Sequence, residues 1–269
     1  MLRRLAPVLL LMGLVLAACG GAALADPKDI VAQGLDTTGN LGSFHVSVAV
    51  TGKVIEPKSG TSITLDGTTL EGDVATSGSA SLTFAVPLLL GLKGDLLLID
   101  GDLYVKTTLT GAKWSHQALP IPSPDASDAS ASPGTNAKAM IAELRKFLAK
   151  DGVVTKKLDD VTCGDRQCYH VQVSIPSSLM ADAGAKASMN PADIFGDALV
   201  IDLQFDKAKL WLTSASVSIE SAKIGTLSLT ITLSAFDVPV TVSPPPADQV
   251  QEGGFNLPGL PGLPGLTLP

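Results

Sequence analysis

Apolar and polar residues alternate along much of this chain, which is the pattern of β-strands with one buried face. The alternation is clearest in residues 43–54, 79–90 and 226–236. Further strands are predicted at 62–76 (one bent strand or two), 95–107, 153–162, 168–175, 198–206 and 208–220, with a hairpin turn at Asp100-Gly101. The apolar positions of the clearest runs are Phe44, Val46, Val48 and Val50; Ala80, Leu82, Phe84 and Val86; and Leu227, Leu229, Ile231 and Leu233.

Helical periodicity occupies only two long stretches. The first is predicted from Pro27 to Thr38, with Asp26 as N-cap, and the second over 137–150, where apolar residues recur every three or four positions. Segments 176–184 and 190–195 are expected to form short helical turns. Strands and helices do not alternate one by one, so the fold class is α+β. We expect one large antiparallel sheet in two halves, with the helices segregated to one side.

The N-terminal residues 1–18 are typical of a secretory signal peptide. Arg3 and Arg4 precede a run from Leu5 to Leu16, which is shorter than the roughly 20 apolar residues of a membrane span. An uncleaved anchor is the alternative. The sequence Leu16-Ala17-Ala18-Cys19 resembles the lipobox of bacterial lipoproteins, which implies cleavage before Cys19 and its acylation. Residues 19–25 would then be a lipidated tether that holds the protein on the extracytoplasmic side of the cell membrane.

The charge of the chain argues against nucleic acid as a partner. Without residues 1–18 the chain has 17 basic and 26 acidic residues, a net charge of −9, whereas nucleic-acid binding depends on neutralising phosphates. Aromatic residues make up only 4% of the sequence. An interior lined by aliphatic side chains is therefore expected, rather than a site that stacks sugars on aromatic rings.

Cys163 and Cys168 are expected to form a disulfide. They lie at the ends of a four-residue loop between two predicted strands, and disulfides persist outside the cytoplasm. A redox pair and a metal site are the alternatives, although this separation fits neither a C-x-x-C motif nor a zinc site without further ligands. Cys19 would then remain free for acylation.

The chain shows none of the familiar catalytic or cofactor-binding motifs. It lacks a G-x-S-x-G elbow, an H-E-x-x-H helix, a P-loop and a Rossmann fingerprint. The chain has three histidines, His45, His116 and His170, each in or near a predicted strand. His170 lies close to the two cysteines, but one histidine beside two cysteines is a weak case for a metal site. We therefore expect no enzyme activity, no cofactor and no catalytic metal.

The composition also indicates how the chain is organised. A single domain is expected over 26–243, with a mobile linker at 118–136 and a disordered tail rich in proline, glycine and leucine at 244–269. Two helices are too few to cover a sheet of about ten strands. Apolar surface left uncovered must be shielded by curvature, a partner or a ligand, so a curved sheet with an apolar hollow is expected.

Several stretches, in this order, resemble the mycobacterial LppX/LprA/LprF/LprG-type lipoproteins of the lipoprotein-carrier superfamily. They are the lipobox at 16–19, "SFHVSVAVTGKV" at 43–54, "LEGDVAT" at 70–76, "LLLIDGDLYVKTTLTGAKW" at 96–114, the central helix, "GDRQCYHVQVSIP" at 164–176 and "FDVPVTVSPP" at 236–245. The similarity covers about residues 26–246. The linker and the tail depart from the family pattern.

The resemblance implies a U-shaped half-barrel sheet whose concave side is covered by helices and encloses an apolar cavity. Family members hold acyl chains of lipids or glycolipids there and carry them across the cell envelope. An envelope sensing role with a protein partner is the alternative, and a monomer is expected. On the alternation pattern, the expected cavity lining is Phe44, Val46, Val48, Val50, Leu82, Phe84, Val86, Leu144, Leu148, Leu203, Leu229 and Ile231.

Overall fold

The computed structural model describes residues 24–253 except 57–58, 110, 120–143 and 183–189. Several predictions lie outside these residues: the signal peptide, acylation of Cys19, most of the 118–136 linker, the first half of helix 137–150 and the tail from residue 254. The first helix among the described residues is α2 (Pro27–Gly39).

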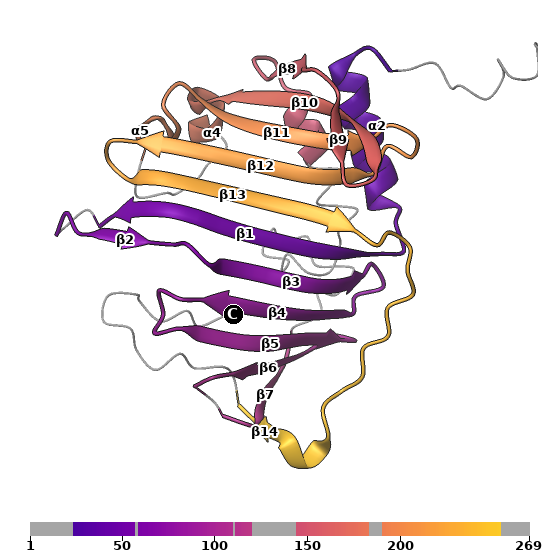
Figure 1. Ribbon diagram of the computed structural model, residues 1–269, viewed down its shortest axis with the longest axis vertical. Coiled ribbons are helices and arrows are strands. Elements are labelled where there is room, and N and C mark those ends of the chain that lie inside the picture. The colour runs from indigo at the N-terminus through magenta and orange to yellow at the C-terminus, as the bar shows by residue number, and fades with distance from the viewer. Residues whose placement is uncertain (1–23, 57–58, 110, 120–143, 183–189, 254–269) are drawn as a thin grey trace, which may run out of the picture.

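One 14-stranded sheet dominates the molecule (Figure 1). Residues 43–118 form its first half and residues 154–234 its second. The first half contains β1 (Ser43–Ile55), β2 (Ser62–Thr64), β3 (Thr68–Ala75), β4 (Ala80–Val86), β5 (Leu92–Ile99), β6 (Asp102–Thr107) and β7 (Trp114–Ala118). The second contains β8 (Val154–Lys157), β9 (Val161–Cys163), β10 (Arg166–Pro176), β11 (Ala198–Asp206), β12 (Leu212–Ser221) and β13 (Gly225–Ser234).

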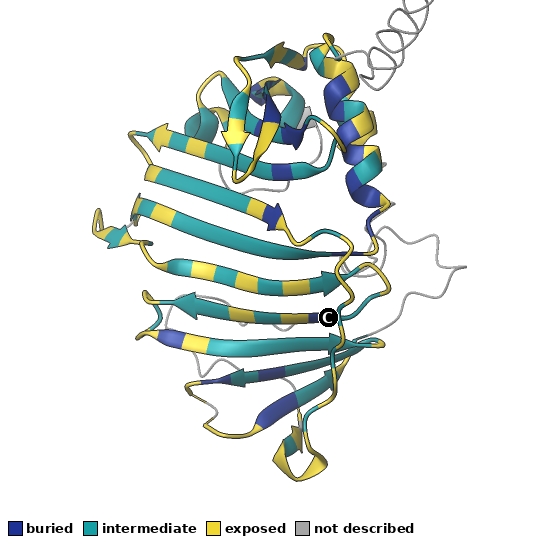
Figure 2. Ribbon diagram, turned by 45° about the vertical axis from the view of Figure 1, so that its right-hand side comes forward, coloured by how far each residue is buried: buried dark blue, intermediate teal, exposed yellow. Residues whose placement is uncertain are grey.

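The two halves meet where β1 pairs with β13. Along the sheet the strand order is β14-β7-β6-β5-β4-β3-β1-β13-β12-β11-β10-β8. β14 (Val250–Glu252) pairs in parallel with β7, and the other described strand pairs are antiparallel. The sheet stays open, and Figure 2 shows its β6–β7 end turning away from the central strands. The predicted α+β fold with a large curved antiparallel sheet is therefore confirmed.

The helices gather at the β8–β12 end of the sheet (Figure 1). Asp26 caps α2 by accepting a hydrogen bond from the Lys28 backbone amide, as predicted. Ile30, Val31 and Leu35 of α2 belong to the main hydrophobic core, together with residues of β10 and β11. Short helices α4 (Ser177–Asp182) and α5 (Pro191–Phe195) follow β10, and residues 144–148 are the described part of the second predicted helix.

Close packing of α2 on β11 depends on a glycine. A Cβ at Gly34 would lie 2.3 Å from Cδ1 of Phe205, so the phenyl ring lies directly against the helix backbone. Phe205 is the largest completely buried side chain among the described residues. This contact fixes the distance between the helix and the sheet.

Two other glycines shape the first half of the sheet. Gly72 in β3 has a φ of 153°, and a Cβ there would lie 2.0 Å from the Ser81 carbonyl oxygen on β4. At Gly94 in β5, a Cβ would meet the Lys106 carbonyl and the ring of Phe84. Strand glycines of this kind mark bends and close backbone approaches, so they contribute to the curvature of the sheet.

Most predicted strands are present, but the 79–90 strand ends at Val86 before a turn, and 153–162 contains two strands, β8 and the start of β9. Asp100 and Gly101 both have positive φ, at 51° and 91°, and connect β5 to β6, as expected for a type I′ hairpin. The 62–76 segment forms two strands, β2 and β3. β12 begins at Leu212 rather than at 208, because the carboxylate of Asp206 accepts hydrogen bonds from the Ala208 and Lys209 amides and holds a turn there.

The structure differs from the prediction in the segment after β13. Residues 235–246 run along one end of the strands towards β7 (Figure 1), and they lead into a 3-10 helix (Ala247–Gln249) and β14. Residues 247–252 of the predicted tail are therefore part of the fold. Near its start this segment is fixed to β1, since the Gly42 amide donates to Asp237 Oδ1 and the Asp237 amide donates to the Ser43 carbonyl.

Candidate functional site

One face of the sheet is apolar from β10 to β6. Residues directly opposite each other on paired strands share a face, and Val48 of β1 lies opposite Ile231 of β13 and Leu70 of β3. Following the same register strand by strand gives a continuous surface, here called the apolar face. Its members include Val171, Val173, Ile201, Leu203, Val217, Leu229, Ile231, Phe44, Val46, Val48, Val50, Leu70, Leu82, Phe84, Val86, Leu96, Leu98 and Val105.

The strand residues expected to line a cavity all lie on this face. The ten are Phe44, Val46, Val48, Val50, Leu82, Phe84, Val86, Leu203, Leu229 and Ile231. Leu148 packs against the main core, and Leu144 is exposed. The expected set contained no residue of β3, β5, β6, β10 or β12, although apolar and polar residues also alternate in several of these strands.

Burial changes along the apolar face. At the β10–β11 end, where α2 covers the sheet, Val171, Val173 and Phe205 are completely buried. Phe44, Val48 and the other apolar-face side chains of β1 and β4 are only half-buried, apart from buried Ala80. The described helices pack against β8, β10, β11 and β12, so they cover one end of the face.

A groove lies between α2, the helical segment 144–148 and β8. It has a volume of about 500 Å³. Val31, Leu35 and Leu148 supply its apolar wall, and Lys28, Arg145 and Lys146 are the cations along it. Arg145 forms an ion pair with Asp36 across the two helices. The groove therefore combines an apolar surface with basic groups next to the covered end of the sheet.

The opposite face of the sheet is polar, and all three histidines lie on it. Each pairs with an aspartate on a neighbouring strand: His45 Nδ1 is 2.8 Å from Asp73 Oδ1, His116 Nε2 is 3.0 Å from Asp102 Oδ1, and His170 Nε2 is 3.1 Å from Asp202 Oδ1. Among the described residues, no group of three or more His, Cys, Asp or Glu side chains is arranged to hold a metal ion.

His45 is expected to make stability depend on pH. The hydrogen bond to Asp73 raises the pKa of His45 above 6.5, with Glu71 acting in the same direction and partial burial opposing it. Its stabilisation is therefore complete below about pH 6.5 and is lost as pH rises through the folded-state pKa. Replacing His45 with glutamine should lower the free energy of unfolding by less than about 1 kcal/mol at pH 6. Denaturant unfolding at pH 6 and at pH 9 should show the loss only at the lower pH, and an equal loss at both would contradict this assignment.

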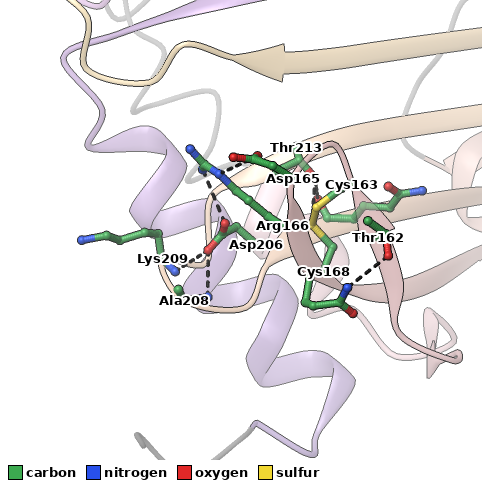
Figure 3. The surroundings of a disulfide bond; sticks show 11 residues. Thr162, Cys163, Asp165, Arg166, Cys168, Asp206, Ala208, Lys209 and Thr213 are labelled. Atoms are coloured by element: carbon green, nitrogen blue, oxygen red, sulfur yellow. Dashed lines mark hydrogen bonds and ion pairs between the residues drawn. A yellow bond between two sulfur atoms is a disulfide. The ribbon is translucent and has the colours of Figure 1, made fainter. Parts of the chain in front are cut away.

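The predicted disulfide is present between Cys163 and Cys168, whose Cα atoms are 6.0 Å apart (Figure 3). It joins the two strands of the β9–β10 hairpin. Cys168 is completely buried, with its sulfur 3.4 Å from Thr213 Oγ1. Arg166, in the same hairpin, pairs with buried Asp206. The cysteines therefore belong to a packed structural cluster on the polar side of the sheet.

Within the described residues, no helix is both long and apolar enough to cross a membrane. No protein-family model matches the sequence, and no curated protein matches it.

Several solved structures are similar to the chain, and three of them are described below. LprF from Mycobacterium bovis matches with a TM-score of 0.52 and 15% identity, over 84% of this chain and 99% of LprF. Mycobacterium tuberculosis lipoprotein LppX matches with a TM-score of 0.49 and 21% identity, over 81% of this chain and all of LppX. The Pseudomonas aeruginosa MucA/MucB complex matches with a TM-score of only 0.31 and 11% identity, over 85% of this chain and 62% of the matched chain. The long sheet, the helices segregated to one end and the similarity to LprF over nearly its whole length show that the chain has the same fold as LprF.

Proposed function

We propose that this protein is a membrane-anchored envelope lipoprotein that binds acyl chains of lipids or glycolipids against the apolar face of its sheet and carries or presents them. The observation that supports this most directly is the continuous apolar face, whose half-buried β1 and β4 side chains lie beyond the described helices. Apolar surface of this extent on a monomeric protein is usually an interaction site. The LprF-like fold is consistent with such a role.

The energetics of this binding come from burial of hydrocarbon. Each methylene removed from water contributes about 0.8 kcal/mol, so two or three acyl chains bind tightly without a specific polar contact. Aliphatic side chains suit chains of variable length, because their contacts are non-directional. A polar headgroup would remain outside the apolar face, where water can solvate it.

The anchor and the location follow from the N-terminal sequence. Cleavage before Cys19 and acylation of its thiol would hold the domain on the extracytoplasmic side of the membrane. The tether is short, since α2 begins at Pro27. Eight residues extended by about 3.4 Å each keep α2 within about 27 Å of the anchor. The acyl-binding domain would therefore work close to a lipid surface.

Native mass spectrometry tests this function. The protein to use is the mature chain, residues 19–269, with Cys19→Ser so that covalent acylation cannot add mass; it contains every described residue. Purified from a lipid-containing host, it should carry non-covalent lipid masses that organic extraction removes. A clean apo spectrum, combined with no uptake of lipid from vesicles, would contradict the proposal.

A further inference from the structure

The turn between β4 and β5 exposes leucine side chains. Leu90 is 94% exposed and Leu88 is 45% exposed. Leu90 also has a φ of 56°, a left-handed conformation in which glycine or asparagine is the usual residue. A bulky apolar residue at a position that is both strained and exposed gains nothing from packing within the fold. Such a residue points to a contact outside the molecule.

A third exposed leucine lies in the adjacent turn. The Thr108 amide donates to the Lys93 carbonyl at 2.9 Å, which ties the start of β5 to the turn between β6 and β7. Leu109, the next residue, is 53% exposed. Three exposed leucines on two neighbouring turns form one group, in contrast to the single apolar side chains scattered over most protein surfaces. We call Leu88, Leu90 and Leu109 the leucine patch.

Cations flank the leucine patch. Lys93 follows the first turn and Lys113 ends the second, and both are exposed. Leucines projecting from a protein, with lysines beside them, match the boundary between acyl chains and lipid headgroups, where apolar side chains enter the hydrocarbon and lysines meet phosphates.

The leucine patch also continues the apolar face. Val86 and Leu92 lie opposite each other at the base of the β4–β5 turn, in line with Phe84 and Leu82. The described N-terminus lies at the other end of the sheet, where the Leu24 amide contacts the Tyr169 hydroxyl of β10. The leucine patch is therefore separate from the region around Leu24 and β10 (Figure 1).

We propose that the leucine patch inserts into the surface of a lipid bilayer, with Lys93 and Lys113 at the headgroups. This gives the protein a membrane contact besides its N-terminal anchor. The contact lies at the strand ends that border the β4–β5 part of the apolar face. The inference does not depend on bound cargo, because it rests on the exposure, backbone conformation and grouping of these leucines.

Site-specific fluorescence tests this contact. In the Cys19→Ser mature chain no free cysteine remains once the Cys163–Cys168 disulfide has formed, so Leu90→Cys can carry a single environment-sensitive dye. Adding vesicles of phosphatidylcholine with about one-third phosphatidylglycerol should shift the dye emission to the blue, and brominated acyl chains should quench it. The matched control is a dye at Val154→Cys, which is 60% exposed on β8 at the far edge of the sheet.

Vesicle co-flotation measures the contribution of the patch. The triple variant Leu88→Ser, Leu90→Ser and Leu109→Ser should lose vesicle affinity by about tenfold or more, because three leucines leave the hydrocarbon. A variant with Val154→Ser and Val238→Ser, both exposed elsewhere, should bind as the parent does. Absence of a dye shift at Leu90, or equal shifts at both labelled positions, would overturn the proposal, as would a partner protein that binds the patch while vesicles do not.

The same samples separate this inference from the proposed function. A triple variant that still contains lipid by native mass spectrometry but no longer floats with vesicles would support both. A Cys19→Ser chain that contains no lipid, together with a dye shift in its labelled Leu90→Cys variant, would contradict the cargo proposal and leave the membrane contact standing.

Discussion

Replacing Val48 with aspartate is expected to reduce retained lipid by tenfold or more. Val48 is half-buried in the middle of the apolar face, with Ile231 and Leu70 directly opposite it on the two neighbouring strands. A carboxylate there would have to lose its hydration when acyl chains cover it, which costs several kcal/mol; about 1.4 kcal/mol already corresponds to tenfold in affinity. Native mass spectrometry of the Cys19→Ser mature chain, with and without Val48→Asp, gives the ratio of lipid-bound to free protein.

The matched control is Ala49→Asp, one residue along β1. Ala49 lies on the polar face, opposite Thr230 and Thr69, so its carboxylate remains in water and lipid retention should stay at the parent level. Circular dichroism and cooperative unfolding of both variants establish that they are folded. Equal lipid retention in the Val48 and Ala49 variants would mean that acyl chains bind somewhere other than the apolar face.

Replacing Phe205 with alanine is expected to lower the free energy of unfolding by about 4 kcal/mol. The side chain is completely buried, and its ring lies against the α2 backbone at Gly34. Its removal leaves a cavity that the helix and β11 can fill only by moving together, which Val171 and Leu203 in the same core oppose. Urea unfolding followed by the fluorescence of Trp114 and Trp211 gives the value.

Leu90→Ala is the comparison for Phe205→Ala. It also shortens an apolar side chain, but that side chain is almost fully exposed, so the free energy of unfolding should change by less than about 0.5 kcal/mol. A loss below about 1 kcal/mol for Phe205→Ala would contradict the role of this contact in holding α2 on the sheet.

Most of the sheet could be predicted because its two faces differ so strongly in polarity. The period-2 alternation of β1, β4 and β13 gave their positions and the side on which each residue lies. The hairpin at Asp100-Gly101 followed from a turn type that requires positive φ at both residues. The α2 helix followed from its cap and its proline. In each case the information is local, within about a dozen residues.

Features that depend on distant segments were not predictable in this way. β14 has only three residues and pairs with β7, more than 130 positions earlier in the sequence. β7 itself, Trp114–Ala118, mixes polar residues with one aromatic and shows no clear alternation. Such short strands are recognised only when the partner is known, because their composition alone resembles a loop.

The candidate site was predictable in part for the same reason. Alternation identifies which residues of one strand share a face. Which face of the next strand lies beside it depends on the register of the pair, and long connections between strands do not determine that register. The pairing of every histidine with an aspartate across two strands is a property of register alone. The leucine patch also needed the structure, because the pairing of β5 with β6 and the hydrogen bonds between Thr108 and Lys93 bring the two turns together.

Photo-crosslinking with a diazirine-labelled fatty acid tests the central claim most directly. The Cys19→Ser mature chain would be loaded with the probe, irradiated and analysed by tandem mass spectrometry at single-residue resolution. We expect adducts on the apolar-face positions of β1 and β4, namely Phe44, Val46, Val48, Val50, Leu82, Phe84 and Val86, and none on the intervening residues. Adducts on His45, Ser47 and Ala49 instead, or adducts confined to the groove beside α2, would contradict binding of acyl chains to the apolar face.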